Sequence, residues 1–164
     1  MCQNLKYLSL TVIFLCNLFA NNLFAEKNRF KVHEHIITDT TNNIEWLRCS
    51  VGQRWNGHTC IGQIVNLSLE RVPDATRLAN EQLGGKWRLP TKKELQSIVC
   101  KSCPSPKIDK KIFPNTDNAP YWTGDRSSFN KKFFVSVNFH TGFSFNRFLP
   151  LKELAIRLVR DKKK

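Results

Sequence analysis

The chain has 164 residues, with 26 lysines and arginines against 13 aspartates and glutamates, which gives a formal net charge of +13. This length fits one ordinary domain behind a leader, and no repeat or low-complexity linker divides it. The basic excess favours association with polyanions such as acidic or sulfated polysaccharide or phosphate-rich envelope material, and it gives no reason to expect a specific nucleic-acid partner. The alternative is a solvated basic surface without a particular ligand.

The first 25 residues are organised like a secretory signal peptide. Lys6 is their only charged residue, an apolar run extends from Leu8 to Ala20, and Ala25 offers a small residue for cleavage. The run is shorter than the about 20 residues that cross a bilayer, and no second run follows. We therefore predict an exported protein, periplasmic or extracellular, without a transmembrane anchor after cleavage. Residues 26–161 would form one domain and residues 162–164 a basic tail, and the oligomeric state is left open.

Four cysteines remain after the predicted leader: Cys49, Cys60, Cys100 and Cys103. An even number in an exported chain favours two disulfides, and of the three pairings we favour Cys49 with Cys60 and Cys100 with Cys103. A redox role for Cys100 and Cys103 is the alternative. It is disfavoured because Cys100 follows a predicted helix, whose C-terminal dipole opposes a thiolate. A four-cysteine zinc site is disfavoured because exported thiols are usually oxidised.

The N-terminal part of the mature chain predicts a β-hairpin. Residues 30–38 read as one strand, in which His33 and His35 share a face that we expect to be exposed and free of metal. Residues 39–43 are rich in turn formers, and a second strand follows with Ile44 and Trp46 on one side. The glycine-containing stretch 49–62 predicts a loop closed by a disulfide.

Two helices are predicted in the middle of the chain. Asp74 can cap the first, and Gly84 ends it. Its apolar side would comprise Ala75, Leu78, Ala79 and Gln82. Pro90 keeps the preceding residue extended, and Thr91 with Glu94 three residues later forms a capping box, so the second helix should start at Thr91. Its apolar face would comprise Leu95, Ile98 and Val99.

The C-terminal part predicts further strands after an irregular loop anchored by Ile108 and Phe113. Strands are expected at residues 121–125, 133–139 and 143–148, and a last strand at 154–160 has two alternating sets of residues. These sets are Leu154, Ile156 and Leu158, and Ala155, Arg157 and Val159. We predict an α+β domain that is rich in loops, with two short helices packed on short antiparallel sheets and the N- and C-terminal strands adjacent.

Several motifs occur in one order along the chain: residues 37–46, 48–62, 85–95, 108–109, 113–116, 121–122 and 157–160. Together they resemble the Lcl C-terminal domain family over residues 37–160. A domain of this family forms the C-terminal end of a bacterial collagen-like adhesin, and such domains also occur alone in exported bacterial proteins. The resemblance implies that the structural framework is formed by Trp46, Trp87, Arg88, Pro90, Thr91, Glu94 and Trp122.

The resemblance implies a C-type-lectin-like fold, akin to that of the formylglycine-generating enzymes, and, for the adhesin, binding of sulfated glycosaminoglycans. The chain departs from these relatives because it has no collagen-like repeat, no calcium-lectin motif and no cysteine pair that matches the oxidase site. We therefore expect no cofactor. Calcium at Asp109, Asp117 or Asp125 is the alternative, because it would suit oxygen ligands.

The expected function is an exported, adhesin-like binding module for anionic or sulfated glycan, without catalysis. Guanidinium groups pair with sulfate or carboxylate through two bonds, and lysines add diffuse charge. The expected contacts are Lys92, Lys93, Tyr121, Arg126, Lys131, Lys132, Phe134 and Arg147. One alternative is a structural component of an envelope or surface assembly with Phe129, Phe143 and Phe148 buried against a partner. A thiol- or metal-dependent enzyme is disfavoured because no nucleophile and base are evidently paired.

Overall fold

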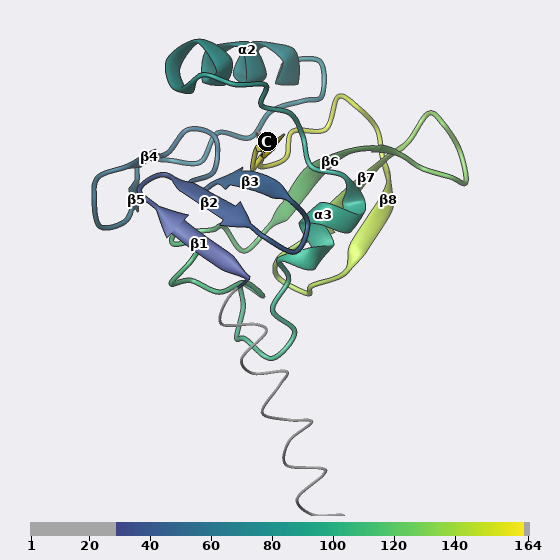
Figure 1. Cartoon of the computed structure of the whole chain (residues 1–164). Helices are drawn as coiled ribbons and strands as arrows, with labels where there is room; N and C mark the ends of the chain where they lie inside the picture. Colours follow the sequence, from purple (N-terminus) through teal and green to yellow (C-terminus); the bar gives the residue numbers. More distant parts are fainter. Residues whose placement is uncertain (1–28, 163–164) are drawn as a thin grey trace, which may run out of the picture.

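The computed structural model describes residues 29–162. The predicted signal peptide, its cleavage site and the last two residues of the basic tail lie outside the described residues. The described chain has the predicted α+β class, with two helices and three antiparallel sheets (Figure 1). No helix in this part of the chain combines the length and the apolar character that crossing a bilayer requires.

The first sheet joins the two ends of the described chain, as predicted. Its order is β1 (Phe30–His33), β2 (Ile36–Asp39), β3 (Ile44–Leu47) and β9 (Val159–Asp161), with β9 paired to β3. The single strand predicted over residues 30–38 is wrong, because Glu34 adopts a positive φ of 50° and reverses the chain between β1 and β2. Ile44 and Trp46 are both buried on one side of β3, as predicted.

The stapled loop, residues 49–62, contains the second and smallest sheet. Strands β4 (Arg54–Trp55) and β5 (Cys60–Ile61) pair within it. The disulfide between Cys49 and Cys60 closes this loop, and a second disulfide joins Cys100 to Cys103, so the favoured pairing is confirmed. Gly52, with φ at 94°, lets the chain pass close to Gln63, whose carbonyl oxygen would lie 2.4 Å from a Cβ at this position.

Helix α2 (Val72–Leu83) lies over β3 at the top of Figure 1. It begins before the predicted cap, because Arg71 occupies the N-cap position and gives no side-chain cap, while Asp74 lies in the first turn. Gly84 ends the helix with φ at 65°, as predicted. Among the residues of α2, only Val72 is fully buried.

Helix α3 (Lys92–Ser97) begins as predicted. The amide of Glu94 donates to Thr91 Oγ1 at 3.2 Å, and the amide of Thr91 donates to Glu94 Oε2 at 2.6 Å, which completes the capping box. The helix ends before Ile98 and Val99. Of the three residues predicted for its apolar face, only Leu95 therefore lies within the helix. Leu95 and Ile98 are both buried in the core.

The third sheet has the order β6 (Pro120–Arg126), β7 (Phe134–Asn138) and β8 (Ser144–Phe148). Tyr121 and Val137 from this sheet, and Phe139 directly after β7, pack into one core cluster with Trp46 and Leu95. A second core cluster lies on the opposite side of the C-terminal segment. It comprises Leu67, Val72, Trp87, Trp122, Leu154, Ile156 and Leu158.

The segment 154–159 passes between the two clusters and is buried throughout. The strand predicted over residues 154–160 is too long. Upstream of β9, the backbone forms hydrogen bonds to several separate segments rather than to one neighbouring strand. Ala155 and Ile156 accept hydrogen bonds from the amides of Trp122 and Val51 at 3.0 and 2.9 Å. The amide of Leu154 donates to Leu67 at 3.1 Å.

Candidate functional site

The predicted glycan contacts gather in part on the β6–β7 hairpin. The Arg126 guanidinium lies 4.6 Å from the centre of the Phe134 ring, and its Nη1 donates to the carbonyl oxygen of Lys131 at 2.8 Å. Arg126, Lys132 and Phe134 line an open hollow of about 550 Å³ together with Leu69, Glu70, Leu149 and Pro150. Three of the eight predicted contacts thus share one depression.

Arg147 lies on the neighbouring strand β8, outside the lining of the hollow. Its guanidinium lies 5.5 Å from the ring centre of Phe129, which belongs to the loop between β6 and β7 and is 76% exposed. We call Arg126, Lys131, Lys132, Phe134 and Arg147 the hairpin face. Within residues 29–162, none of its four cations forms an ion pair, whereas Arg29, Arg77, Arg88 and Arg160 all do.

The remaining predicted contacts lie elsewhere. Lys92 and Lys93 are exposed at the start of α3, and the amide of Lys92 donates to Asp125 Oδ2 at 2.7 Å, so an acidic residue separates them from Arg126. The prediction that Tyr121 provides a stacking surface is wrong, because its side chain has no exposed area. Its hydroxyl lies 3.0 Å from Ser50 Oγ and accepts from the amide of Asp117, also at 3.0 Å.

The framework residues of the resemblance lie mainly in the interior. Trp46, Trp87 and Trp122 are buried. Arg88 donates to both carboxylate oxygens of Glu94 at 2.9 Å. Burial by itself raises the pKa of Glu94, but the hydrogen bonds from Arg88 and Thr91 outweigh it and hold the pKa below its ordinary value.

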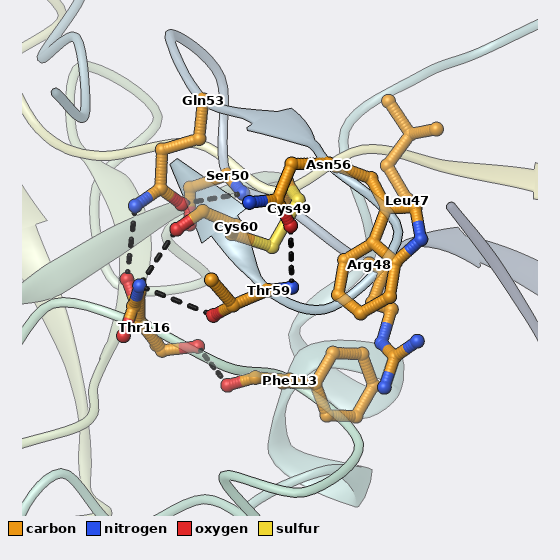
Figure 2. Close-up of a disulfide and its surroundings, with 12 residues drawn as sticks. Leu47, Arg48, Cys49, Ser50, Gln53, Asn56, Thr59, Cys60, Phe113 and Thr116 are labelled. Atoms are coloured by element: carbon orange, nitrogen blue, oxygen red, sulfur yellow. Dashed lines mark hydrogen bonds between the residues drawn. A yellow bond between two sulfur atoms is a disulfide. The ribbon is translucent and has the colours of Figure 1, made fainter. Parts of the chain in front are cut away.

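The stapled loop places further side chains around its disulfide, as Figure 2 shows. Gln53 accepts a hydrogen bond from the Ser50 amide at 3.3 Å, and the hydroxyl of Thr116 points to the carbonyl oxygen of Phe113, to which it donates at 2.9 Å (Figure 2). The Arg48 guanidinium lies 3.8 Å from the ring centre of Trp55. Ser50, Gln53 and Trp55 of this loop also form part of the wall of a cavity.

The cavity has a volume of about 770 Å³ and lies beneath α2, and we call it the groove. The apolar side of α2 provides Ala75, Leu78, Ala79 and Leu83, and the opposite wall provides Leu47, Val51, Trp55, Val65, Leu67 and Leu158. Leu78 and Leu83 remain 45% and 40% exposed. The helical periodicity predicted the apolar side of α2, but it could not show that this side faces a cavity rather than a packed core.

A buried cation lies behind the groove wall. Arg157 has no exposed area, and its Nη2 donates to Ser50 Oγ at 3.2 Å, while Ser50 itself lines the groove. Its Nη1 donates to the carbonyl oxygens of Leu47 and Arg48. Burial lowers the pKa of Arg157 to about 10, so the group stays charged at neutral pH. Arg157 forms no ion pair with any residue in the range 29–162.

Residues 29–162 contain no group of three or more histidine, cysteine, aspartate or glutamate side chains placed to hold a metal ion. The three aspartates considered for calcium lie in local hydrogen bonds. Asp109 Oδ1, Asp117 Oδ1 and Asp125 Oδ2 accept from the amides of Lys111, Asn118 and Lys92 at 2.8, 2.7 and 2.7 Å. His33 and His35 flank the turn at Glu34 and line the rim of the groove.

No curated protein matches this chain. The model of the Lcl C-terminal domain matches residues 35–160, which include the stapled loop, both helices and the third sheet. The match covers well over half of the chain and contains the hairpin face and the groove lining except for His33 and Glu34. The chain belongs to the Lcl C-terminal domain family.

Proposed function

We propose that the chain is an exported, non-catalytic binding module that captures an anionic polysaccharide through its hairpin face. The observation that supports this most directly is a set of four cations on β6, β8 and the loop between β6 and β7, none of which forms an ion pair within residues 29–162, with Arg126 and Arg147 held over the rings of Phe134 and Phe129. Guanidinium groups held over rings are oriented in advance and lose less freedom when they bind sulfate or carboxylate. Glu70 is the only acidic residue among those that line the hollow.

Export is supported by the two disulfides, which are typical of an oxidising compartment. The absence of catalysis is supported by the position of the Cys100–Cys103 disulfide. It follows α3 rather than preceding a helix, and a C-terminal helix dipole does not favour a reactive thiolate. The binding function therefore depends on display of charge rather than on a reacting group.

The test compares two double variants that remove the same charge from different places. Lys131→Gln with Lys132→Gln alters the hairpin face, and Lys110→Gln with Lys111→Gln alters exposed positions in the loop after the second disulfide. Retention of each protein on immobilised heparin and on a neutral glycan is measured across a salt gradient. We expect the first pair to elute from heparin at clearly lower salt and the second pair to elute close to the wild type.

Equal losses for both double variants would show that net charge alone causes the retention, and they would overturn the proposal. Arg126→Gln and Arg147→Gln extend the test to the two arginines held over rings, and each should also weaken binding to heparin. Circular dichroism and thermal unfolding serve as controls, because these side chains lie at the surface and their loss should leave the fold intact.

A structural role in a surface assembly is the second candidate. It is favoured by Phe129 and Phe143, each 76% exposed, and by Leu151, which is 67% exposed. Exposed apolar side chains of this size mark contact surfaces when they lie together. Phe143→Ser should lower the mass observed in light scattering if such an assembly forms from copies of this chain, and it should leave retention on heparin unchanged.

A further inference from the structure

The geometry points to a second ligand site in the groove, which takes a small amphiphile with an apolar body and an anionic head. The volume of about 770 Å³ lies within the range of about 300–1,000 Å³ that is typical of pockets for small molecules. The site is separate from the hairpin face, since none of the hairpin-face residues lines the groove. This inference goes beyond the proposed glycan binding and does not depend on it.

The apolar body follows from the two walls. Helix α2 turns Leu78 and Leu83 toward the groove and leaves both partly exposed, and among its residues only Val72 is fully buried. The opposite wall includes Leu67 and Leu158, which belong to the buried core. A ligand that fills this space would remove apolar surface from water on both walls, at about 25 cal/mol for each Å² buried.

The anionic head follows from the charges at the rim. The ionisable groups that line the groove are His33, Glu34, His35, Arg54, Arg71 and Asp74. Glu34 is engaged, because its Oε2 accepts from the indole N–H of Trp55 at 3.1 Å and Arg48 stacks on the same ring. Arg54 and Arg71 form no ion pair within residues 29–162.

Two further features make the potential in the groove more positive. The charge of Arg157 lies directly behind Ser50 without a carboxylate partner in the described part of the chain. The N-terminal turn of α2 borders the groove through Arg71, and its N-cap residue gives no side-chain hydrogen bond to the first amides. Asp74 in that turn opposes an anion, and its removal should therefore strengthen binding.

The experiment uses three ten-carbon compounds that differ in the head group: decanoate, 1-decanol and decyltrimethylammonium. Each is titrated by calorimetry into the oxidised protein purified from cells that express the whole chain. We expect decanoate to bind about tenfold more tightly than the trimethylammonium compound, with decanol in between. Arg71→Gln should weaken binding of decanoate and Asp74→Asn should strengthen it, while both changes should affect binding of decanol little.

Two variants test the position of the apolar body. Ala79→Phe should fill the groove, and Leu78→Glu should place a negative charge inside it, so each should lower the affinity for decanoate by about tenfold or more. Leu151→Glu is the matched control, because Leu151 is an exposed leucine outside the groove and its change should leave the affinity unaltered. Since Leu78 is partly exposed, Leu78→Glu keeps the test valid if Ala79→Phe does not fold.

Equal affinity for the three compounds would contradict the preference for an anionic head group. Unchanged binding of decanoate by both groove variants would contradict the location of the site in the groove. Vesicles of phosphatidylglycerol distinguish binding of a free amphiphile from binding to a membrane surface. Sedimentation of the protein with these vesicles, without binding of monomeric decanoate, would also contradict the inference. Retention on heparin by Leu78→Glu should equal that of the wild type, so failure of this site is distinguishable from failure of the hairpin face.

Discussion

Arg157 Nη2 donates a hydrogen bond of 2.7 Å to Thr116 Oγ1 in the interior of the protein. The same guanidinium lies 4.9 Å from the ring centre of Phe113 and reaches the carbonyl oxygens of Leu47 and Arg48. Arg157, which has no carboxylate partner within residues 29–162, thus joins the start of the stapled loop, the irregular loop near Thr116 and the C-terminal segment. Its two Nη atoms make these hydrogen bonds, whereas its buried Nε has no hydrogen-bond partner among residues 29–162.

Arg157→Met should lower the free energy of unfolding by about 2–4 kcal/mol, because buried oxygen acceptors lose their donors. Urea denaturation at neutral pH measures this change. Arg147→Met is the control, since Arg147 is exposed and its replacement should alter stability by no more than about 0.5 kcal/mol. An Arg157→Met protein as stable as the wild type would show that desolvation of the charge outweighs its hydrogen bonds.

Asp39 should make stability depend on pH in the acid range. Burial by itself raises the pKa of its carboxyl, but hydrogen bonds from Arg29 and Asn42 outweigh burial and lower the pKa below its ordinary value. The stabilisation is therefore complete above the unfolded pKa of about 3.9 and is lost as the pH falls through the lower folded pKa. Asp39→Asn should lower the free energy of unfolding by about 3 kcal/mol at pH 6.

Urea denaturation of both proteins between pH 6 and pH 2 checks this prediction, and the difference between them should shrink toward the acid end. Other carboxylates, such as Glu94, contribute equally to both curves and cancel in the difference. Glu81→Gln is the control, because its pair with Arg77 is exposed and contributes little. A difference that stays constant with pH would contradict the assignment to ionised Asp39.

Thr91→Ala should lower the free energy of unfolding by about 1 kcal/mol, because the amide of Glu94 loses its acceptor at the start of α3. Thr91→Ser keeps the hydroxyl and should restore most of the loss. Chemical denaturation of the three proteins measures the effect. Lys93→Ala on the same helix should change stability little, and a loss as large as that of Thr91→Ala would argue against a specific role for the cap.

The two disulfides should contribute unequally. The Cys49–Cys60 bridge spans 11 positions and the Cys100–Cys103 bridge spans 3. Loop-closure entropy assigns about 3 kcal/mol to the longer loop and about 2 kcal/mol to the shorter one. Replacement of each cysteine pair by serines should therefore lower the unfolding temperature more for the first pair, as measured by differential scanning calorimetry. A larger loss for the second pair would contradict this order.

Binding measurements on the same two proteins give a second check. Cys49 lines the groove, and its disulfide fixes the stapled loop that forms one wall. Loss of the first bridge should therefore weaken binding of decanoate, and loss of the second should leave it nearly unchanged. The Cys100–Cys103 disulfide lies outside the groove lining and serves as the matched control.

Features that depend on near neighbours in the chain could be predicted from the sequence. The capping box at Thr91 and the helix end at Gly84 follow from residues a few positions apart, and the structure contains both. Both disulfides also follow from short separations along the chain. The predicted start of α2 is wrong. Pro73 favours the first turn of a helix, and the helix therefore begins ahead of Asp74.

Which faces are buried depends on contacts that the sequence pattern does not contain. The alternation in residues 154–159 shows two sides, and both are buried because the segment runs between two core clusters. Arg157 is enclosed by oxygens up to 110 positions away, and Tyr121 is enclosed rather than available for stacking. The groove beneath α2 likewise depends on how a helix and a distant loop are placed. Burial results from contacts between residues far apart in the chain, and local pattern does not specify those contacts.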